Sequence, residues 1–275
     1  MGRPGGDLGP AGNARPGRMS AARLGKADLH IHASASDGMA EPQQLLDYVE
    51  TQTDLDVIAV TDHDNPRGAE AVREAWANDH YRFQVIPGIE VTALEGHLLA
   101  LFVERPIAPF RRIEETLEEV HKQGGLSVIP HPMSWLTRSL GQRVIERIIA
   151  TGRGGDYFDG IETANQTVAA RATIRKAGQL NEERYHLASV GCSDAHFLLA
   201  VGSAYTTFAG SSAPELRRSI EERSSSSANG VHPTWRQIGA GQMARQTWRG
   251  LTTTPRTLGL GPTCASFVRR IVRFR

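Results

Sequence analysis

Cysteine is scarce in this chain of 275 residues, where only Cys192 and Cys264 occur. Two cysteines are too few for a disulfide framework or for a zinc site built from thiolates. They suit a reducing compartment, so we expect a cytoplasmic protein. Any metal site would therefore draw its ligands from imidazole nitrogens and carboxylate oxygens.

Long hydrophobic runs are missing as well. The longest unbroken apolar run covers residues 98–103, well short of the roughly 18–20 residues that cross a bilayer. Residues 1–24 are rich in Gly, Pro, Ala and Arg and show no periodicity. We expect neither a membrane span nor a secretory signal, and we expect residues 1–24 to form a disordered extension with a translation start at Met19 rather than Met1.

Acidic residues are missing from residues 224–275, which carry eight Arg. Residues 26–223 carry 19 basic and 29 acidic side chains, so the net charge of +1 hides an acidic centre. We expect an Arg-rich C-terminal appendage over 224–275 that begins with a serine linker, Ser224–Ser227. The appendage could bind RNA or DNA, with Trp235 and Trp248 stacked on bases. It could instead pack these aromatic residues on the acidic centre, which we favour.

Between these ends, apolar runs of strand length alternate with helical patterns. This order predicts parallel βαβ units, and hence an α/β barrel or a doubly wound sheet. Both folds build their sites at the carboxyl ends of the strands. We expect strands over 27–33, 57–62, 83–90, 97–103, 126–130, 160–163 and 187–191, and helices over 42–52, 66–78, 109–123, 140–150, 168–180 and 214–223.

Six of the ten histidines lie at ends of the expected strands, together with several carboxylates. His30 and His32 alternate along the first strand, so both side chains point to the same face. A single histidine in such a place usually makes ordinary hydrogen bonds, but one polynuclear metal site explains all of these strand ends at once. The candidate metal ligands are His30, His32, Asp37, His63, Glu90, His97, His131, Asp194 and His196. We expect ordinary roles for His80, His121, His186 and His232.

Imidazole and carboxylate ligands without thiolates fit Zn, Mn or Fe ions and do not suit a calcium cage. Nine ligands are too many for one ion, so we expect two to three divalent ions. Clustered divalent ions stabilise the charge that develops in phosphoryl transfer, and they lower the pKa of a bound water molecule. The ligand set therefore predicts an enzyme that hydrolyses phosphate esters with a water molecule activated by metal.

The motifs resemble those of the PHP (polymerase and histidinol phosphatase) family of metal-dependent phosphoesterases over about residues 26–210. They are Asp28-Leu29-His30-Ile31-His32, Ser36-Asp37-Gly38, Thr61-Asp62-His63-Asp64, Pro87-Gly88-Ile89-Glu90, Ile129-Pro130-His131-Pro132 and Ser193-Asp194-Ala195-His196. The resemblance implies a distorted (β/α)7 TIM-like barrel over 26–223 and a trinuclear site. It implies one ion on His30, His32, Glu90 and Asp194, a second on Asp37, His63 and His196, and a third on Glu90, His97 and His131.

Further residues are candidates for supporting or catalytic roles. Asp62 and Asp64 flank a ligand and would fix its imidazole ring. Asn165 would hydrogen-bond the substrate or a ligand loop. Arg138 would grip a phosphate from the side opposite the metals, so Asp62, His63 and Arg138 are our candidate catalytic residues.

The substrate is less well defined than the chemistry. It could be a phosphomonoester, a nucleotide or an oligonucleotide. Family members that act on 3′,5′-nucleoside bisphosphates or on RNA 5′ ends carry a substantial insertion between the motifs of His97 and His131, and only 33 residues separate the two here. The alternatives are a metal-dependent amidohydrolase, which also opens its barrel with His-x-His, and a nucleic-acid-associated module that binds through the Arg-rich appendage. An amidohydrolase commonly uses a carbamylated Lys on a strand, and no expected strand carries a Lys after Lys26.

Overall fold

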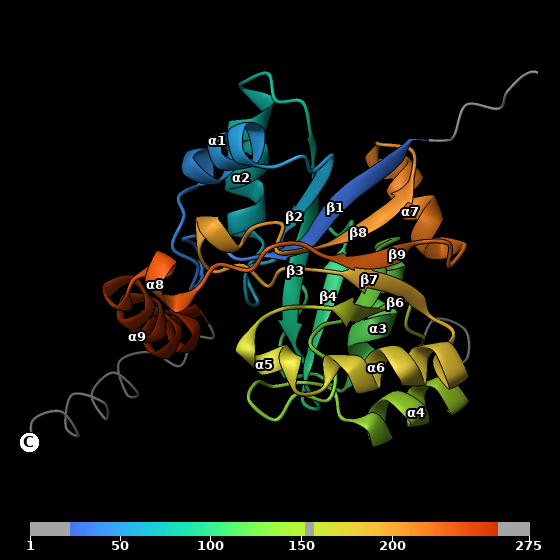
Figure 1. Cartoon of the computed structure of the whole chain (residues 1–275). Helices are drawn as coiled ribbons and strands as arrows, with labels where there is room; N and C mark the ends of the chain where they lie inside the picture. Colours follow the sequence, from blue (N-terminus) through green and yellow to red (C-terminus); the bar gives the residue numbers. More distant parts are fainter. Residues whose placement is uncertain (1–22, 152–156, 258–275) are drawn as a thin grey trace, which may run out of the picture.

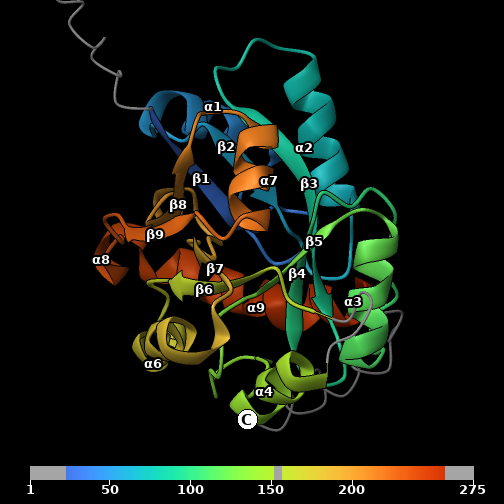
Figure 2. The same cartoon turned by 90° about the vertical axis from the view of Figure 1, so that its right-hand side faces the viewer.

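The computed structural model describes residues 23–151 and 157–257. In this part of the chain, nine strands form one sheet in the order β7-β6-β5-β4-β3-β2-β1-β8-β9 (Figures 1 and 2). The strands are β1 (Leu24–Ile31), β2 (Val57–Val60), β3 (Gln84–Thr92), β4 (His97–Leu101), β5 (Leu126–Ile129), β6 (Gly160–Ala164), β7 (Ala188–Gly191), β8 (Ala204–Ala209) and β9 (Ser226–Asn229).

The two edges of the sheet curl toward each other. Thr163 Oγ1 in β6 donates a hydrogen bond to Ser227 Oγ in β9 at 2.8 Å. Ser225 Oγ, just before β9, donates to the carbonyl oxygen of Ser189 in β7 at 2.9 Å. The backbone N–H of Gly191 in β7 donates to a side-chain oxygen in β8. The sheet is therefore a nearly closed α/β barrel, the distorted TIM-like barrel that the family resemblance implies.

Not all strands are parallel, contrary to the expectation from simple βαβ units. The pairs β1–β2, β2–β3, β5–β6 and β6–β7 are parallel, whereas β4 runs antiparallel to both β3 and β5. Only residues 93–96 connect β3 to β4, and a parallel crossover needs a dozen residues or more. This reversal brings the first residue of β4 to the same end of the barrel as the last residues of β3 and β5, the strands on either side of it.

All seven expected strands are present, but the sequence analysis missed β8 and β9. β8 runs antiparallel to β1 and to β9. The prediction of a linker at Ser224–Ser227 is wrong in its second half, because Ser226 and Ser227 pair with β8. Backbone pairing here depends on the neighbouring strand and not on apolar side chains, which the serine run lacks.

Helices cover the outside of the barrel (Figures 1 and 2). The expected helix over 168–180 is divided at Thr173, whose φ of −120° departs from helical geometry. The described residues contain no helix long and apolar enough to cross a membrane. The helical segments are α1 (Pro42–Gln52), α2 (Arg67–Ala77), α3 (Ile113–Lys122), α4 (Gln142–Thr151), α5 (Val168–Arg171), α6 (Ile174–Leu180), a π-helical turn (Asn181–Tyr185), a 3-10 turn (Leu198–Ala200), α7 (Ala213–Glu221), α8 (Trp235–Ile238) and α9 (Ala240–Thr257).

Both faces of the strands are buried. In β2, Val57 and Ala59 pack inside the barrel, while Ile58 and Val60 pack outward on α1 and α2. This two-sided burial explains why the strands appear in the sequence as unbroken apolar runs. α7 covers one end of the barrel and inserts Leu216 and Ile220 into the interior cluster. α8 and α9 lie at the opposite side of the molecule (Figure 1).

Gly38 lies close to the backbone of His32, and a substitution there tests how tightly the loop after β1 is packed. A Cβ atom at Gly38 would overlap the carbonyl oxygen of His32, whereas one at Gly178 in α6 would meet no atom within 4 Å. We expect Gly38→Ala to lower the free energy of unfolding by about 1–3 kcal/mol. Gly178→Ala should raise it by about 0.5–1 kcal/mol, because alanine loses less entropy in a helix. Urea unfolding measures both, and equal effects of the two substitutions would contradict the packing.

Candidate metal centre

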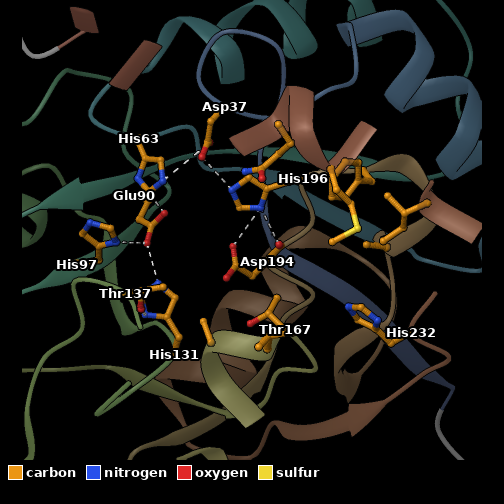
Figure 3. A pocket seen from close by; sticks show the side chains of 17 residues that line it. Asp37, His63, Glu90, His97, His131, Thr137, Thr167, Asp194, His196 and His232 are labelled. Carbon is orange, nitrogen blue, oxygen red and sulfur yellow. Dashed lines mark hydrogen bonds and ion pairs between the residues drawn. The ribbon is translucent and has the colours of Figure 1, made fainter. Parts of the chain in front are cut away.

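The nine expected metal ligands lie together at one end of the barrel. Eight of them come from a strand or the residues that follow it, and Asp37 comes from the loop after β1. His97 joins this set because it is the first residue of the reversed strand β4. Seven of the nine line a cavity of about 430 Å³ (Figure 3), and His30 and His32 lie buried beneath it.

Glu90 occupies the middle of the cluster. Its Oε1 lies 2.7 Å from His97 Nδ1 and 3.0 Å from His131 Nε2. Its Oε2 is within 3.3 Å of ring nitrogens of three further histidines, which are His30, His32 and His63. A carboxylate offers about four lone-pair sites, so five imidazoles cannot all donate good hydrogen bonds to it.

A second carboxylate, Asp37, gathers ligands on the other side of His63 (Figure 3). Its Oδ2 lies 3.2 Å from His196 Nε2, and its Oδ1 lies 3.9 Å from His63 Nε2. His32 stacks on His196 with ring centroids 4.2 Å apart. Asp194 completes the cluster, with Oδ1 3.3 Å from His32 Nε2.

Four overlapping groups in this cluster are compact enough to hold an ion. All the ligand atoms of each group lie within 4.8 Å of one another. Together the groups use every one of the nine expected ligands, and several histidines belong to two groups. The groups are His32, Asp37, His63 and His196; His30, His131 and Asp194; His30, His32 and Glu90; and His63, Glu90 and His97. The chain therefore holds a multi-metal site, and the assignment of ligands to particular ions stays a prediction.

The ring nitrogens themselves fit metal ions better than hydrogen bonds. His32 Nδ1 is buried without a hydrogen-bond partner. The Nδ1 atoms of His63 and His97 are close to Glu90 oxygens but lack the direction of a hydrogen bond. Buried polar atoms are rarely left unpaired, and neutral imidazole nitrogens are ligands for divalent transition metals.

Electrostatics keep the carboxylates ionised. Burial would raise the pKa of Glu90, but its electrostatic interactions with the surrounding imidazoles, which include His63, His97 and His30, outweigh burial and hold the pKa well below its ordinary value. Burial opposes ionisation of Asp37 too, and the charge of His196 overcomes it, so the Asp37 pKa is also strongly lowered. Both side chains are therefore ready to bind cations at neutral pH.

The histidines differ in protonation. Burial lowers the pKa of His63 to about 4, so this ring is neutral at pH 7. Burial also acts on His196, but the charge of Asp37 outweighs it and raises the His196 pKa to about 10. In the protein without metal, His196 therefore carries a proton that a metal ion must displace.

Glu162 is a residue of this site that the sequence analysis did not identify. It is fully buried in β6, and its Oε1 lies 2.9 Å from His30 Nδ1. Its Oε2 accepts hydrogen bonds from the backbone N–H of His131 at 2.6 Å and from Asn165 Nδ2 at 2.8 Å. Glu162 thus orients one ligand ring and one ligand loop, as partners of metal-binding histidines do. An acidic residue inside an apolar strand was the available signal.

The two aspartates that flank His63 form hydrogen bonds that hold neighbouring segments of the backbone in place. Asp62 Oδ1 accepts hydrogen bonds from the backbone N–H of Ala33 and from Ser36 Oγ, which shapes the loop that leads to Asp37. Burial raises the Asp62 pKa to about 7. Asp64 accepts two hydrogen bonds from Thr92 at 2.6 and 2.7 Å, which tie the end of β2 to β3.

Arg138 does not lie among the cavity residues. Its guanidinium donates to the carbonyl oxygens of Ala93 and Leu94, both at 3.3 Å, and lies over the ring of Phe110. Its neighbours Thr137 and Ser139 are closer to the site, with side-chain oxygens 3.2 and 2.7 Å from His131 Nδ1. The loop after β5 therefore orients a ligand ring, and the carbonyl oxygen of Arg138 accepts a hydrogen bond from the backbone N–H of His97 at 2.7 Å, but the Arg138 guanidinium does not reach the ligands.

The described part of the C-terminal segment packs beside the cavity. Trp235 and Trp248 are 62% and 54% exposed, so these aromatic residues do not attach the segment to the barrel as we expected. Arg249 does so instead, because its Nη2 donates to the carbonyl oxygens of Ser34 and Ser36. His232, Ile238, Met243 and Gln246 line the cavity, and the ordinary role that we expect for His232 stays a prediction. Residues beyond 257, with the last Arg residues, lie outside the described part, as do residues 1–22 of the expected disordered extension.

Comparison with known sequences adds independent evidence. A family model described as PHP-associated matches residues 175–225. The chain is 32% identical over 151 residues to the uncharacterized protein MJ1587 of Methanocaldococcus jannaschii, and the match covers 51% of this chain and 81% of that protein. It is also 32% identical over 116 residues to the 5′-3′ exoribonuclease Rnm of Salmonella typhimurium, which covers 35% of this chain and 39% of that enzyme.

Solved structures agree on the fold. A two-domain protein from Bacteroides vulgatus, described as containing a predicted PHP-like metal-dependent phosphoesterase, superposes with a TM-score of 0.62 at 20% identity. The superposition covers 83% of this chain and 70% of that protein. From the matching motifs, which the barrel gathers into one cluster, and from these relatives, the chain belongs to the PHP family of metal-dependent phosphoesterases.

Proposed function

We propose that this protein hydrolyses phosphate esters at a trinuclear site that uses Mn, Fe or Zn ions. The convergence of five imidazoles on the buried Glu90 carboxylate is the observation that supports it most directly. Buried charges of this density need counter-charges in the same place. Divalent ions between the imidazoles and the carboxylates would satisfy both kinds of ligand.

The ligands would be divided as the family resemblance implies, with Glu90 shared between two ions. When bound, such ions lower the pKa of a water molecule toward neutrality and neutralise the charge that develops on a phosphoryl group. Glu162 holds the His30 ring, and Asp62 holds the loop that carries Asp37, so the protein fixes the ligand positions before substrate binds. To reach a phosphate, the Arg138 guanidinium would have to break its hydrogen bonds to the carbonyl oxygens of Ala93 and Leu94. We therefore do not include Arg138 among the proposed catalytic residues.

The substrate class is a phosphomonoester, a nucleotide or a short oligonucleotide. One relative is a 5′-3′ exoribonuclease, but its similarity covers only about a third of this chain. A panel of phosphomonoesters, 3′,5′-bisphosphates and short 5′-phosphorylated RNA, with added Mn²⁺ and an amide substrate for contrast, would distinguish these classes. Cleavage of the amide substrate alone would contradict the proposed function.

Metal content provides a first test. We expect the purified protein to contain about two to three Mn, Fe or Zn ions per chain by elemental analysis. Dialysis against a chelator should lower both the melting temperature and the activity, because ligands that bind only the folded state stabilise it. Restoring Mn²⁺ should restore both. A protein that stays active after complete metal removal would refute the mechanism.

Metal binding should release protons at pH 7. His196, with a pKa of about 10, is protonated in the metal-free protein and must lose its proton to become a ligand. The apparent metal affinity should therefore increase as the pH rises toward 10. Calorimetric titration of the chelated protein in two buffers of different ionisation enthalpy measures the release, and we expect about one proton or more per chain. The same binding enthalpy in both buffers would mean that no proton is displaced.

Substitution of individual ligands tests the site. His32→Ala and Asp194→Asn should each reduce kcat by at least about 100-fold, because each removes a direct metal ligand. His80→Ala should change kcat little, since His80 is exposed in the loop before β3. Circular dichroism would verify that all three variants fold. Full activity in both ligand variants would exclude the cluster as the active site.

A further inference from the structure

The cavity above the metal ligands has two chemically different sides. Seven histidine and carboxylate ligands form one side. The rest of the lining includes six apolar residues, which we call the apolar wall. They are Val168, Ala169, Phe197, Ala200, Ile238 and Met243.

The C-terminal segment contributes directly to this second side. Ile238 ends α8, and Met243 and Gln246 lie three residues apart on α9, so they share one face of that helix. The next residue on this face is Arg249, whose hydrogen bonds to Ser34 and Ser36 fasten the helix to the loop before Asp37. The wall is thereby held at a fixed place relative to a metal ligand.

The polar residues on this side are uncharged at neutral pH. Thr167 and Gln246 carry no charge, and burial lowers the pKa of His232 below its ordinary value. His232 lies across the cavity from Glu90 and His97 (Figure 3). A phosphate on the metal side would therefore leave the rest of its ester facing an apolar, uncharged surface.

We propose that the apolar wall binds an uncharged, apolar organic group of the substrate, such as an aromatic ring, and that Met243 on α9 determines this specificity. The inference rests on the proposed function, because it assumes that the metal ions bind the phosphoryl group. A cavity of about 430 Å³ has room for such a group beside a phosphate. Burying the ring against Met243 and Ile238 would remove apolar surface from water, which favours binding.

A binding experiment on the Mn²⁺-loaded full chain tests this proposal without turnover. Benzylphosphonate and methylphosphonate carry the same phosphonate group, and their C–P bonds resist hydrolysis. We expect calorimetry to show benzylphosphonate binding at least about tenfold more tightly. The Met243→Gln substitution keeps the length of the side chain but makes it polar. In this variant the dissociation constant of methylphosphonate divided by that of benzylphosphonate should decrease by at least about fivefold. Met243→Leu, which keeps the side chain apolar, should have the same ratio as the wild-type protein.

Leu251→Gln is the matched control. Leu251 lies on α9, is 59% exposed and does not line the cavity, so this variant should keep the wild-type ratio. Equal binding of the two phosphonates, binding of neither, or an unchanged ratio in Met243→Gln would overturn the proposal. If benzylphosphonate is preferred but no phosphate ester is hydrolysed, the apolar wall stands and the proposed function fails.

Discussion

The burial of one carboxylate among five imidazoles is the constraint on which the rest of this structure depends. Glu90 can occupy that place only if strands far apart in the sequence end at the same point. The parallel strands bring their carboxyl ends there, and β4 must run in the opposite direction to present His97 at its start. The short connection between β3 and β4 is therefore as necessary to the site as the ligands themselves.

The ligands could be predicted from the sequence because each is a metal-binding residue type beside an apolar run. Strand ends in an α/β barrel converge, so sequence position alone indicated that His30, His63 and His131 would meet. Glu162 could not be identified in the same way, because it lies inside a strand with no histidine beside it. The strand β9 was not predicted, because its serine residues do not form an apolar run and its pairing with β8 depends on backbone hydrogen bonds.

The side of the cavity built by α8 and α9 could not be predicted for a related reason. Its residues have helical spacing, which determines which of them share a face but not the surface on which that face packs. Arg249 determines the surface through backbone carbonyl oxygens at Ser34 and Ser36, and carbonyl oxygens have no sequence signature. The sequence suggested Trp235 and Trp248 as the residues that pack this segment on the barrel, but both are exposed, and Ile238 and Met243 line the cavity instead.

The charge of the site depends on what it holds. Asp37, Glu90 and Asp194 place three negative charges under the cavity, and electrostatics keep them ionised. Protonated imidazoles such as His196 balance part of this negative charge when no metal is bound, and three divalent ions would make the surface strongly positive. Attraction of the phosphoryl group would then come from the metal side and would be similar for any phosphate ester. Discrimination among esters must come from the other side, which is why the packing of a C-terminal helix matters to the chemistry of the barrel.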